Sequence, residues 1–308
     1  MRSSLRHTPR ALRAAHPASR PAPWLQQFHP QQSRAQPPSR KLSTTPPAHH
    51  NPSSPTSSSV NETEISHFSA LASSWWDPHG PSRPLHLMNP HRHDFIQACL
   101  ASSPQPDPTP NPLRYLDVGC GGGIFAESAA RLPTTASVTA IDPSPQILAV
   151  ARAHAKRDPS LSRGGKLTYL SETIESLPLP AAPADRFDVV SVFEVVEHVD
   201  YPAAFLDRVG EFVRPGGWLV LSTIARTWTS WVTTNLVAED ILGVVPKGTH
   251  DWYKYINEEE LRAYFAGKGG VWGVPRVMGV VFVPGFGWKE VRGSEKVGNY
   301  FVGVQNVG

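Results

Sequence analysis

The chain has 308 residues, with 29 Lys and Arg, 26 Asp and Glu, and a formal net charge of +3. Eight basic residues and no acidic ones precede Glu62, which leaves 21 basic and 26 acidic residues from Glu62 onward. The larger part of the chain is therefore acidic, which argues against binding to nucleic acid. Two cysteines exclude a disulfide framework, and no apolar run approaches the roughly 18 residues of a membrane-spanning helix.

Residues 1–60 differ in composition from the rest of the chain. They are rich in Ser, Pro and His, contain no acidic residue and lack the apolar run of a secretory signal. This composition is typical of an organelle transit peptide, and Arg40-Lys41-Leu42-Ser43 resembles a matrix-protease site with cleavage after Leu42. We predict a mitochondrial transit peptide over 1–42 and a disordered Ser/Pro linker over 43–60. The alternative is a disordered tail without a function.

Two helices are expected next. Asn61 with Glu64 three residues later is typical of a helix N-cap with a reciprocal glutamate, and apolar residues at helical spacing continue to Trp76. Pro78 ends this helix because it restricts the residue before it. A second, short helix is predicted over 89–100. Together these segments form an N-terminal helical extension.

From residue 114 onward, short apolar runs alternate with amphipathic segments, as a parallel sheet with crossover helices requires. This alternation predicts a doubly wound, Rossmann-like α/β domain within 61–308, with a mostly parallel seven-stranded sheet. The predicted strands cover 114–119, 137–142, 166–170, 187–193, 218–224, 277–283 and 300–304, and the predicted helices cover 124–132, 144–156, 202–213 and 257–266.

A glycine-rich loop over 116–123 lies between a strand and a helix, where the backbone can pass close to a ligand. A dinucleotide site requires a third glycine where Ile124 stands, although a shifted match from Gly121 exists. S-adenosylmethionine instead favours an acidic strand residue, here Asp117, ahead of the loop that begins at Gly119. The acidic residue faces an ammonium group.

Asp142 follows the second predicted strand, 25 residues after Asp117. A carboxylate at this position can accept hydrogen bonds from both ribose hydroxyls, in nicotinamide and in S-adenosylmethionine sites alike. The alternative is a helix cap just before Pro143. Together with the glycine loop, Asp142 favours a nucleotide-cofactor site.

These residues resemble the class I S-adenosylmethionine-dependent methyltransferases and, more narrowly, the ubiquinone biosynthesis O-methyltransferases that act on polyprenyl catechols. The resemblance covers most of the chain from about Ile65 to Gln305. It rests on Phe68, Trp75-Trp76-Asp77-Pro78, Pro84-Leu85-His86, Asn89-Pro90-His91-Arg92, residues 116–123, Glu194-Val195-Val196-Glu197-His198-Val199, Arg214-Pro215-Gly216-Gly217 and Val245-Pro246-Lys247-Gly248-Thr249-His250-Asp251.

The resemblance implies that Arg92, Gly119, Asp142 and Phe193 contact S-adenosylmethionine. A guanidinium at Arg92 suits the cofactor carboxylate, whereas the alternative is a surface arginine at a helix end. Phe193 departs from the smaller or flexible apolar residue expected in the family. Its backbone, or stacking beside the adenine, is what the resemblance supports there.

Glu194, Glu197 and His198 follow the fourth predicted strand, whose carboxyl end faces the ligand crevice of such a sheet. The resemblance implies that these three residues bind Mg²⁺, which would orient the catechol oxygens and lower the phenol pKa. An alternative is that His198 is the general base and Glu197 orients it. A third possibility is a solvated carboxylate loop with a capping histidine.

The segment over 227–256 combines apolar and aromatic residues with Lys and His residues at its edges, a pattern typical of an interfacial helix. The resemblance implies peripheral attachment to the matrix face of the inner mitochondrial membrane, within an assembly of ubiquinone biosynthesis proteins. Covering of the active site or of a second copy is the alternative. For the Trp75–Trp76 pair, core packing or a lid is favoured over substrate contact.

The resemblance implies methyl transfer from S-adenosylmethionine to a phenolic hydroxyl of polyprenyl-dihydroxybenzoate and demethylubiquinol. Two other classes stay open. A nicotinamide-dependent oxidoreductase would use the same glycine loop and Asp142, but Ile124 argues against it. A non-catalytic scaffold subunit with this fold would be expected to lose Asp142 or the residues at 194–198, and all of these are present.

Overall fold

The structure is a computed structural model that describes residues 59–70, 72–103, 112–162, 164–227 and 254–308. The predicted transit peptide, most of the predicted linker and residues 228–253 of the predicted insertion lie outside the described residues. Those predictions stay predictions.

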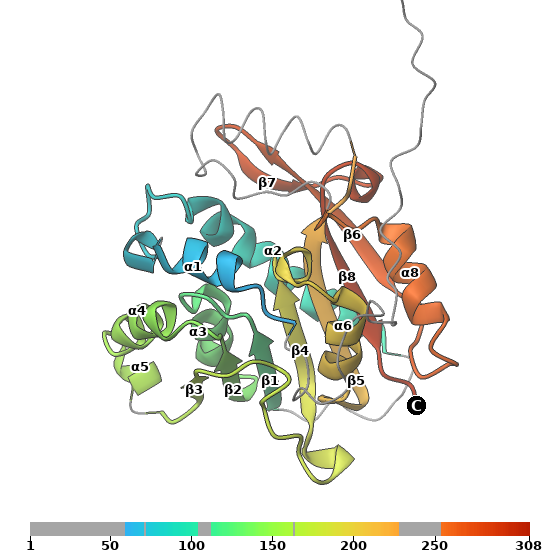
Figure 1. The fold of residues 1–308 in the computed structure, drawn as a ribbon, viewed down its shortest axis with the longest axis horizontal. Helices are drawn as coiled ribbons and strands as arrows, with labels where there is room; N and C mark the ends of the chain where they lie inside the picture. The colour runs from blue at the N-terminus through green and yellow to red at the C-terminus, as the bar shows by residue number, and fades with distance from the viewer. Residues whose placement is uncertain (1–58, 71, 104–111, 163, 228–253) are drawn as a thin grey trace, which may run out of the picture. The chain divides into compact units, whose positions relative to one another are not determined.

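A twisted sheet forms the centre of the described part (Figure 1). Its strand order is β3-β2-β1-β4-β5-β8-β6-β7, with parallel pairing from β3 to β5 and antiparallel pairing from β5 to β7. The strands are β1 (Leu113–Val118), β2 (Thr135–Ile141), β3 (Leu167–Leu170), β4 (Phe187–Phe193), β5 (Val213–Ile224), β6 (Arg276–Val283), β7 (Gly287–Glu290) and β8 (Asn299–Gln305).

The predicted mostly parallel α/β sheet is confirmed, but the strand number differs. The sequence predicted seven strands, and the sheet has eight because β7 pairs with β6 in an antiparallel hairpin. This strand has only four residues, Gly287-Trp288-Lys289-Glu290, which carry no clear alternation of apolar and polar side chains. Its position depends on pairing with β6 rather than on its own pattern.

Helices flank the sheet and differ from the predictions mainly at their ends. The first predicted helix ends at Ala70 instead of Trp76, and the second begins at Arg83 instead of Asn89 because Ser82 and Pro84 form its first turn. The helices are α1 (Glu62–Ala70), α2 (Arg83–Ala101), α3 (Ile124–Arg131), α4 (Pro145–Ala155), α5 (Pro159–Ser162), α6 (Pro202–Gly210) and α8 (Glu258–Ala266), with short 3₁₀ turns η2 (Ala72–Ser74), η3 (Pro183–Asp185), η4 (Val196–His198) and η7 (Ser294–Lys296).

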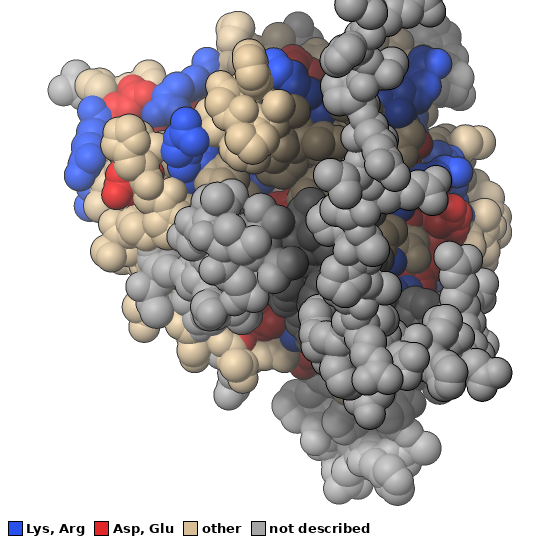
Figure 2. Space-filling view, turned by 90° about the horizontal axis from the view of Figure 1, so that it is seen from above, with Lys and Arg blue, Asp and Glu red and all other residues tan. Residues whose placement is uncertain are grey.

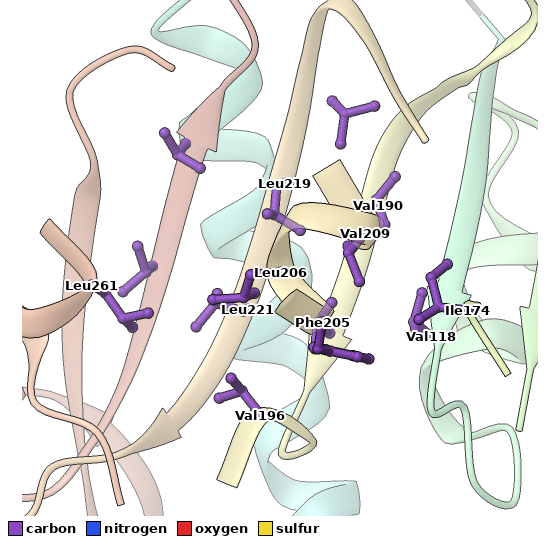
Figure 3. Packing of buried hydrophobic residues seen from close by; sticks show 14 of the residues in the cluster. Val118, Ile174, Val190, Val196, Phe205, Leu206, Val209, Leu219, Leu221 and Leu261 are labelled. Carbon is purple, nitrogen blue, oxygen red and sulfur yellow. The ribbon is translucent and has the colours of Figure 1, made fainter. Parts of the chain in front are cut away.

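Two apolar cores form because successive strand residues point to opposite faces of the sheet. On one face, Val190 and Leu221 pack with α6 and α8, and Figure 3 shows Leu206 and Val209 of α6 among the side chains of this cluster. On the other face, alternate residues of the same strands, such as Val189, pack against α2 and α3. Both faces of the parallel strands are thus buried, as in other α/β folds.

The N-terminal extension packs on the start of two sheet-covering helices. Ala72 and Trp75 form a third cluster with Ile124 of α3 and Ile147 of α4. The core-packing interpretation of Trp75 is therefore confirmed. Its ring also covers the glycine loop, as described below.

The strand order reverses direction between β1 and β4, since β2 and β3 continue to one side of β1 while β4 and β5 continue to the other. In an open α/β sheet, ligands bind in the crevice beyond the carboxyl ends of the strands at such a point. A ligand site is therefore expected among the residues that follow β1, β2 and β4.

Among the described residues, no helix is long and apolar enough to cross a bilayer. Figure 2 shows Lys and Arg side chains beside Asp and Glu side chains on the described part of one face, with uncharged surface between them.

Candidate active site

A cavity of about 1250 Å³ lies at the carboxyl ends of β1, β2 and β4 and continues beneath α1 and α2. Every site residue predicted from the sequence contributes to its wall. These residues are Arg92, Asp117, Gly119, Gly121, Asp142, Phe193, Glu194, Glu197 and His198.

The glycine loop begins where β1 and β2 end side by side. The amides of Gly119 and Cys120 both donate to the Ile141 carbonyl, at 2.9 and 3.0 Å. Gly121 has a φ of 53°, in the left-handed region, and a Cβ there would overlap the ring of Trp75. The loop therefore needs glycine both for its backbone conformation and for the close approach of Trp75.

Asp142 closes the loop from the side of β2. One of its carboxylate oxygens accepts from the Gly121 amide at 3.0 Å and the other from the Ser144 amide at 2.9 Å. Ser144, not Asp142, caps α4, because its hydroxyl accepts from the Ile147 amide. Burial raises the pKa of Asp142. Each oxygen retains a lone pair for a ligand hydroxyl.

Asp117 lies one residue before the end of β1 and is almost completely buried. The Ser191 hydroxyl donates to it at 2.7 Å. Burial raises its pKa to about 7, against the lowering effects of Ser191 and of the Arg92 charge. A carboxyl group with a pKa near 7 loses its proton when a cation binds beside it.

Arg92 is only 4% exposed, and the described residues offer its Nε no hydrogen-bond partner. Its guanidinium lies 4.8 Å from the centroid of the Phe193 ring, and burial lowers its pKa, against the raising effects of Glu194 and Asp117. A buried arginine with an unsatisfied donor is costly to the fold unless a ligand completes it. The surface-arginine interpretation is wrong.

The Phe193 ring is a packing element. It stacks beneath Arg92 and contacts Phe125 edge-on, with 4.9 Å between ring centroids. The ring thereby holds the guanidinium at the wall of the cavity.

Glu194 immediately follows β4 and has a φ of 56°, a conformation that costs a residue with a side chain about 1–2 kcal/mol. The Ser222 hydroxyl donates to its carboxylate at 2.7 Å. Backbone strain of this kind is concentrated at functional sites.

Glu197 and His198 form part of the turn η4. Glu197 is 3% exposed and accepts from the Thr223 hydroxyl at 2.9 Å. Burial, together with the nearby Glu194 charge, raises the Glu197 pKa to about 7.

The partner of His198 comes from the N-terminal extension. His198 Nδ1 donates to the Glu64 carboxylate at 3.1 Å, and Lys254 Nζ donates to the other Glu64 oxygen at 2.9 Å. These contacts lower the Glu64 pKa to about 2, with the His198 hydrogen bond as the largest cause. The pKa of His198 is raised because the Glu64 hydrogen bond and nearby carboxylates outweigh desolvation.

Sequence reasoning assigned Glu64 to a capping role. The Asn61 side chain does cap α1, accepting from the Thr63 and Glu64 amides at 3.0 and 3.2 Å. The Glu64 carboxylate, however, is directed to His198, 134 residues away. No local signal could have revealed that pairing.

The predicted metal ligands Glu194, Glu197 and His198 line the same cavity. Within the described ranges, no group of three His, Cys, Asp or Glu side chains is arranged to hold a metal ion. Ser222, Thr223 and Glu64 engage the three side chains instead. The described residues thus give no support for the Mg²⁺ that the family resemblance implies, and this site stays a prediction.

A crevice at the strand-order switch point, with a glycine loop after β1 and an acid after β2, is shared by α/β enzymes that bind a nucleotide cofactor, among them the class I S-adenosylmethionine-dependent methyltransferases. Residues 88–269 match a family model described as a methyltransferase domain. The structure is also similar to a crystal structure of the methyltransferase domain of bacterial-CtHen1-CN, with a TM-score of 0.50 and 18% identity over 71% of this chain and 99% of that one.

Curated relatives identify the family within this class. The chain is 39% identical to a mitochondrial ubiquinone biosynthesis O-methyltransferase of Candida albicans, over 81% of this chain and 86% of the relative. It is 41% identical to one of Schizosaccharomyces pombe (80% and 87%) and 42% identical to a ubiquinone biosynthesis O-methyltransferase of Cereibacter sphaeroides (74% and 89%). The chain belongs to the ubiquinone biosynthesis O-methyltransferase family.

The predicted S-adenosylmethionine-dependent O-methyltransferase is thereby confirmed. The alternatives of a nicotinamide oxidoreductase and of a non-catalytic scaffold are set aside.

Proposed function

We propose that this enzyme methylates a phenolic hydroxyl of a polyprenyl-dihydroxybenzoate and of demethylubiquinol. The observation that carries the proposal is the buried Arg92 with its unpartnered Nε, in one cavity with the glycine loop and the His198–Glu64 pair. The Arg92 guanidinium suits the carboxylate of an amino-acid cofactor, and the His198–Glu64 pair suits the removal of a phenolic proton.

Five residues would hold S-adenosylmethionine. Arg92 binds its carboxylate, Asp117 its ammonium group, and Asp142 its ribose hydroxyls, while Gly119 and Gly121 allow close passage of the backbone. The cofactor supplies a methyl group already activated on a sulfonium. Binding neutralises both the buried cation and the buried acid, which the cavity otherwise leaves poorly solvated.

His198 is the proposed general base. Because Nδ1 donates to Glu64, Nε2 is the ring nitrogen that takes the phenolic proton, and the carboxylate stabilises the imidazolium that results. Glu197 precedes His198 in the turn η4, and its charge helps to raise the His198 pKa. Positioning of the phenolate in a water-poor cavity provides the remaining catalysis.

The test is methyl transfer by the full-length chain from S-adenosylmethionine to a catechol carboxylic acid that carries a short prenyl chain. We expect His198→Ala to lower kcat by about 10²–10⁴-fold while S-adenosylhomocysteine affinity, measured by calorimetry, stays the same. Absence of methyl transfer by the wild-type enzyme would refute the proposed substrate.

Magnesium binding by Glu194, Glu197 and His198 stays a separate prediction, and no step above depends on it. Calorimetric titration of the chain with Mg²⁺, repeated with Glu194→Ala, tests it. Equal heats for the two proteins would count against this site.

We further propose that the enzyme lies in mitochondria, peripherally on the matrix face of the inner membrane, among other ubiquinone biosynthesis proteins. The acid-free leader and the mitochondrial names of the Candida albicans and Schizosaccharomyces pombe relatives support the compartment. For the membrane contact through 227–256, Trp231→Glu with Leu242→Glu should reduce flotation with vesicles that contain anionic lipid. Unchanged flotation would exclude that segment as the anchor.

A further inference from the structure

The cavity is larger than the cofactor residues require. Its volume of about 1250 Å³ exceeds the roughly 300–1,000 Å³ typical of a pocket for one small molecule. The proposed cofactor residues occupy the end formed by β1, β2 and β4, whereas the opposite end lies between α2 and the β6–β7 hairpin. The proposed cofactor site does not account for that opposite end of the cavity.

One face of α2 connects the two ends. Leu85, Met88 and Arg92 lie at helical spacing, and all three line the cavity. From Arg92 to Leu85 the helix runs back about 10 Å, and along this distance the wall changes from a charged to an apolar one. The cavity is therefore an elongated space with a polar end and an apolar end.

The hairpin forms the far wall and is fastened to α2. Trp288 of β7 donates from its indole nitrogen to the Pro84 carbonyl at 2.9 Å, and His91 Nε2 donates to the Trp288 carbonyl at 3.0 Å. Phe282 of β6 packs edge-on against Trp288, with 5.3 Å between ring centroids. Both aromatic residues contribute to the cavity wall.

The hairpin leaves apolar side chains uncovered at this end. Pairing of β6 with β8 stops at Val280, and β6 continues with β7 alone (Figure 1). Beyond that point Val281 is 37% and Phe282 is 36% exposed, and both line the cavity. Apolar side chains at the open end of a ligand cavity mark a surface that a ligand covers.

We propose that this apolar end, between α2 and the β6–β7 hairpin, binds the polyprenyl chain of the substrate. The proposal rests on the proposed function, which places the catechol near His198 in the same cavity. A hydrocarbon chain has no hydrogen bonds to satisfy, so it suits a wall of Leu85, Met88, Val281, Phe282 and Trp288. The exposed positions of Val281 and Phe282 lie where a chain longer than the cavity leaves it.

The test compares two substrates in the absence of membranes: the dihydroxybenzoate head group alone and the same head group with a farnesyl chain. The quantity measured is the ratio of their kcat/KM values. In the full-length protein, Val281→Ser with Phe282→Ala should lower the preference for the farnesyl substrate about tenfold, because each change removes contacts with the farnesyl group. Val281→Ser alone, which keeps the Phe282–Trp288 contact, should lower it about threefold.

The matched control is Val274→Ser with Phe286→Ala. These residues are 84% and 75% exposed and do not belong to the cavity wall of the described residues, so the control should keep the wild-type ratio. Equal loss of preference in the control would indicate a general effect of surface apolarity, such as lipid contact, and would overturn the site. An unchanged ratio in the Val281 and Phe282 variants would also overturn it.

The two proposals fail in different ways. Methylation of the head group with an unchanged ratio in all variants refutes the prenyl site alone. Methylation of neither substrate by the wild-type enzyme refutes the proposed function, and the prenyl site with it.

Discussion

Replacement of Arg92 by Met should separate the stability of the fold from cofactor binding. Arg92 is 4% exposed, and its Nε has no partner among the described residues. Its burial carries a desolvation cost that the Phe193 ring and the nearby carboxyl groups of Asp117 and Glu194 partly offset. Methionine is shorter but unbranched and flexible, favours contact with an aromatic ring and needs no hydrogen bond. The cofactor-free variant should therefore keep or increase its free energy of unfolding.

The magnitude of the binding loss follows from the bond removed. A hydrogen-bonded pair between a buried guanidinium and a carboxylate contributes about 1.5–3 kcal/mol, which corresponds to a loss of about 10- to 150-fold in affinity for S-adenosylhomocysteine. Calorimetric titration gives the affinity, and urea unfolding without ligand gives the stability. The unfolding free energy should change by about 0 to +2 kcal/mol, since apolar replacement of a buried charge is often neutral or stabilising.

Arg226→Met is the matched control. Arg226 is 6% exposed but has two good partners, the Tyr255 carbonyl at 2.8 Å and the Glu260 carboxylate at 2.7 Å. Its loss should destabilise the protein by about 2–4 kcal/mol and leave the affinity for S-adenosylhomocysteine unchanged. If Arg92→Met instead behaved like Arg226→Met, Arg92 would be a structural residue, and the reasoning would be refuted.

Three further predictions concern other parts of the site. Burial raises the pKa of Asp117 to about 7, and a bound ammonium group lowers it. The affinity for S-adenosylhomocysteine, measured by calorimetry, should therefore increase as the pH rises from about 6 to 8. The same measurement on Asp117→Asn should show an affinity that does not change with pH. Glu64→Gln removes the carboxylate that raises the His198 pKa. The acid limb of the kcat–pH profile should therefore move to lower pH, and kcat should fall about tenfold. An acid limb at the wild-type pH would exclude the His198–Glu64 pair from catalysis. Gly121→Ala places a Cβ on a left-handed backbone and against the Trp75 ring, so it should destabilise the protein by about 2 kcal/mol in urea unfolding. Gly285→Ala is the control, because Gly285 is also left-handed but has nothing near its Cβ. That change should destabilise the protein by about 1 kcal/mol.

Local patterns predicted most of the elements and the location of the site. The glycine loop, the acid after β2 and the cluster after β4 each lie directly beyond a strand, and the carboxyl ends of parallel strands meet at one edge of a sheet. Eight of the nine predicted site residues consequently line one cavity, and Arg92 joins them from α2. Element ends were predicted less well, as with α2, whose first turn uses Ser82 and Pro84 ahead of the expected start at Asn89.

The sequence by itself determined what is local: the alternation of strands and helices, the capping of α1 and α4, and the residue types of the cofactor loop. Tertiary structure decided which distant side chains meet. Glu64 reaches His198 across 134 positions, and β7 is a strand only because β6 offers its edge. The unsatisfied Nε of Arg92 likewise follows from how α2 places the guanidinium over the Phe193 ring. Such pairings depend on chain packing, since neither partner carries a pattern that specifies the other.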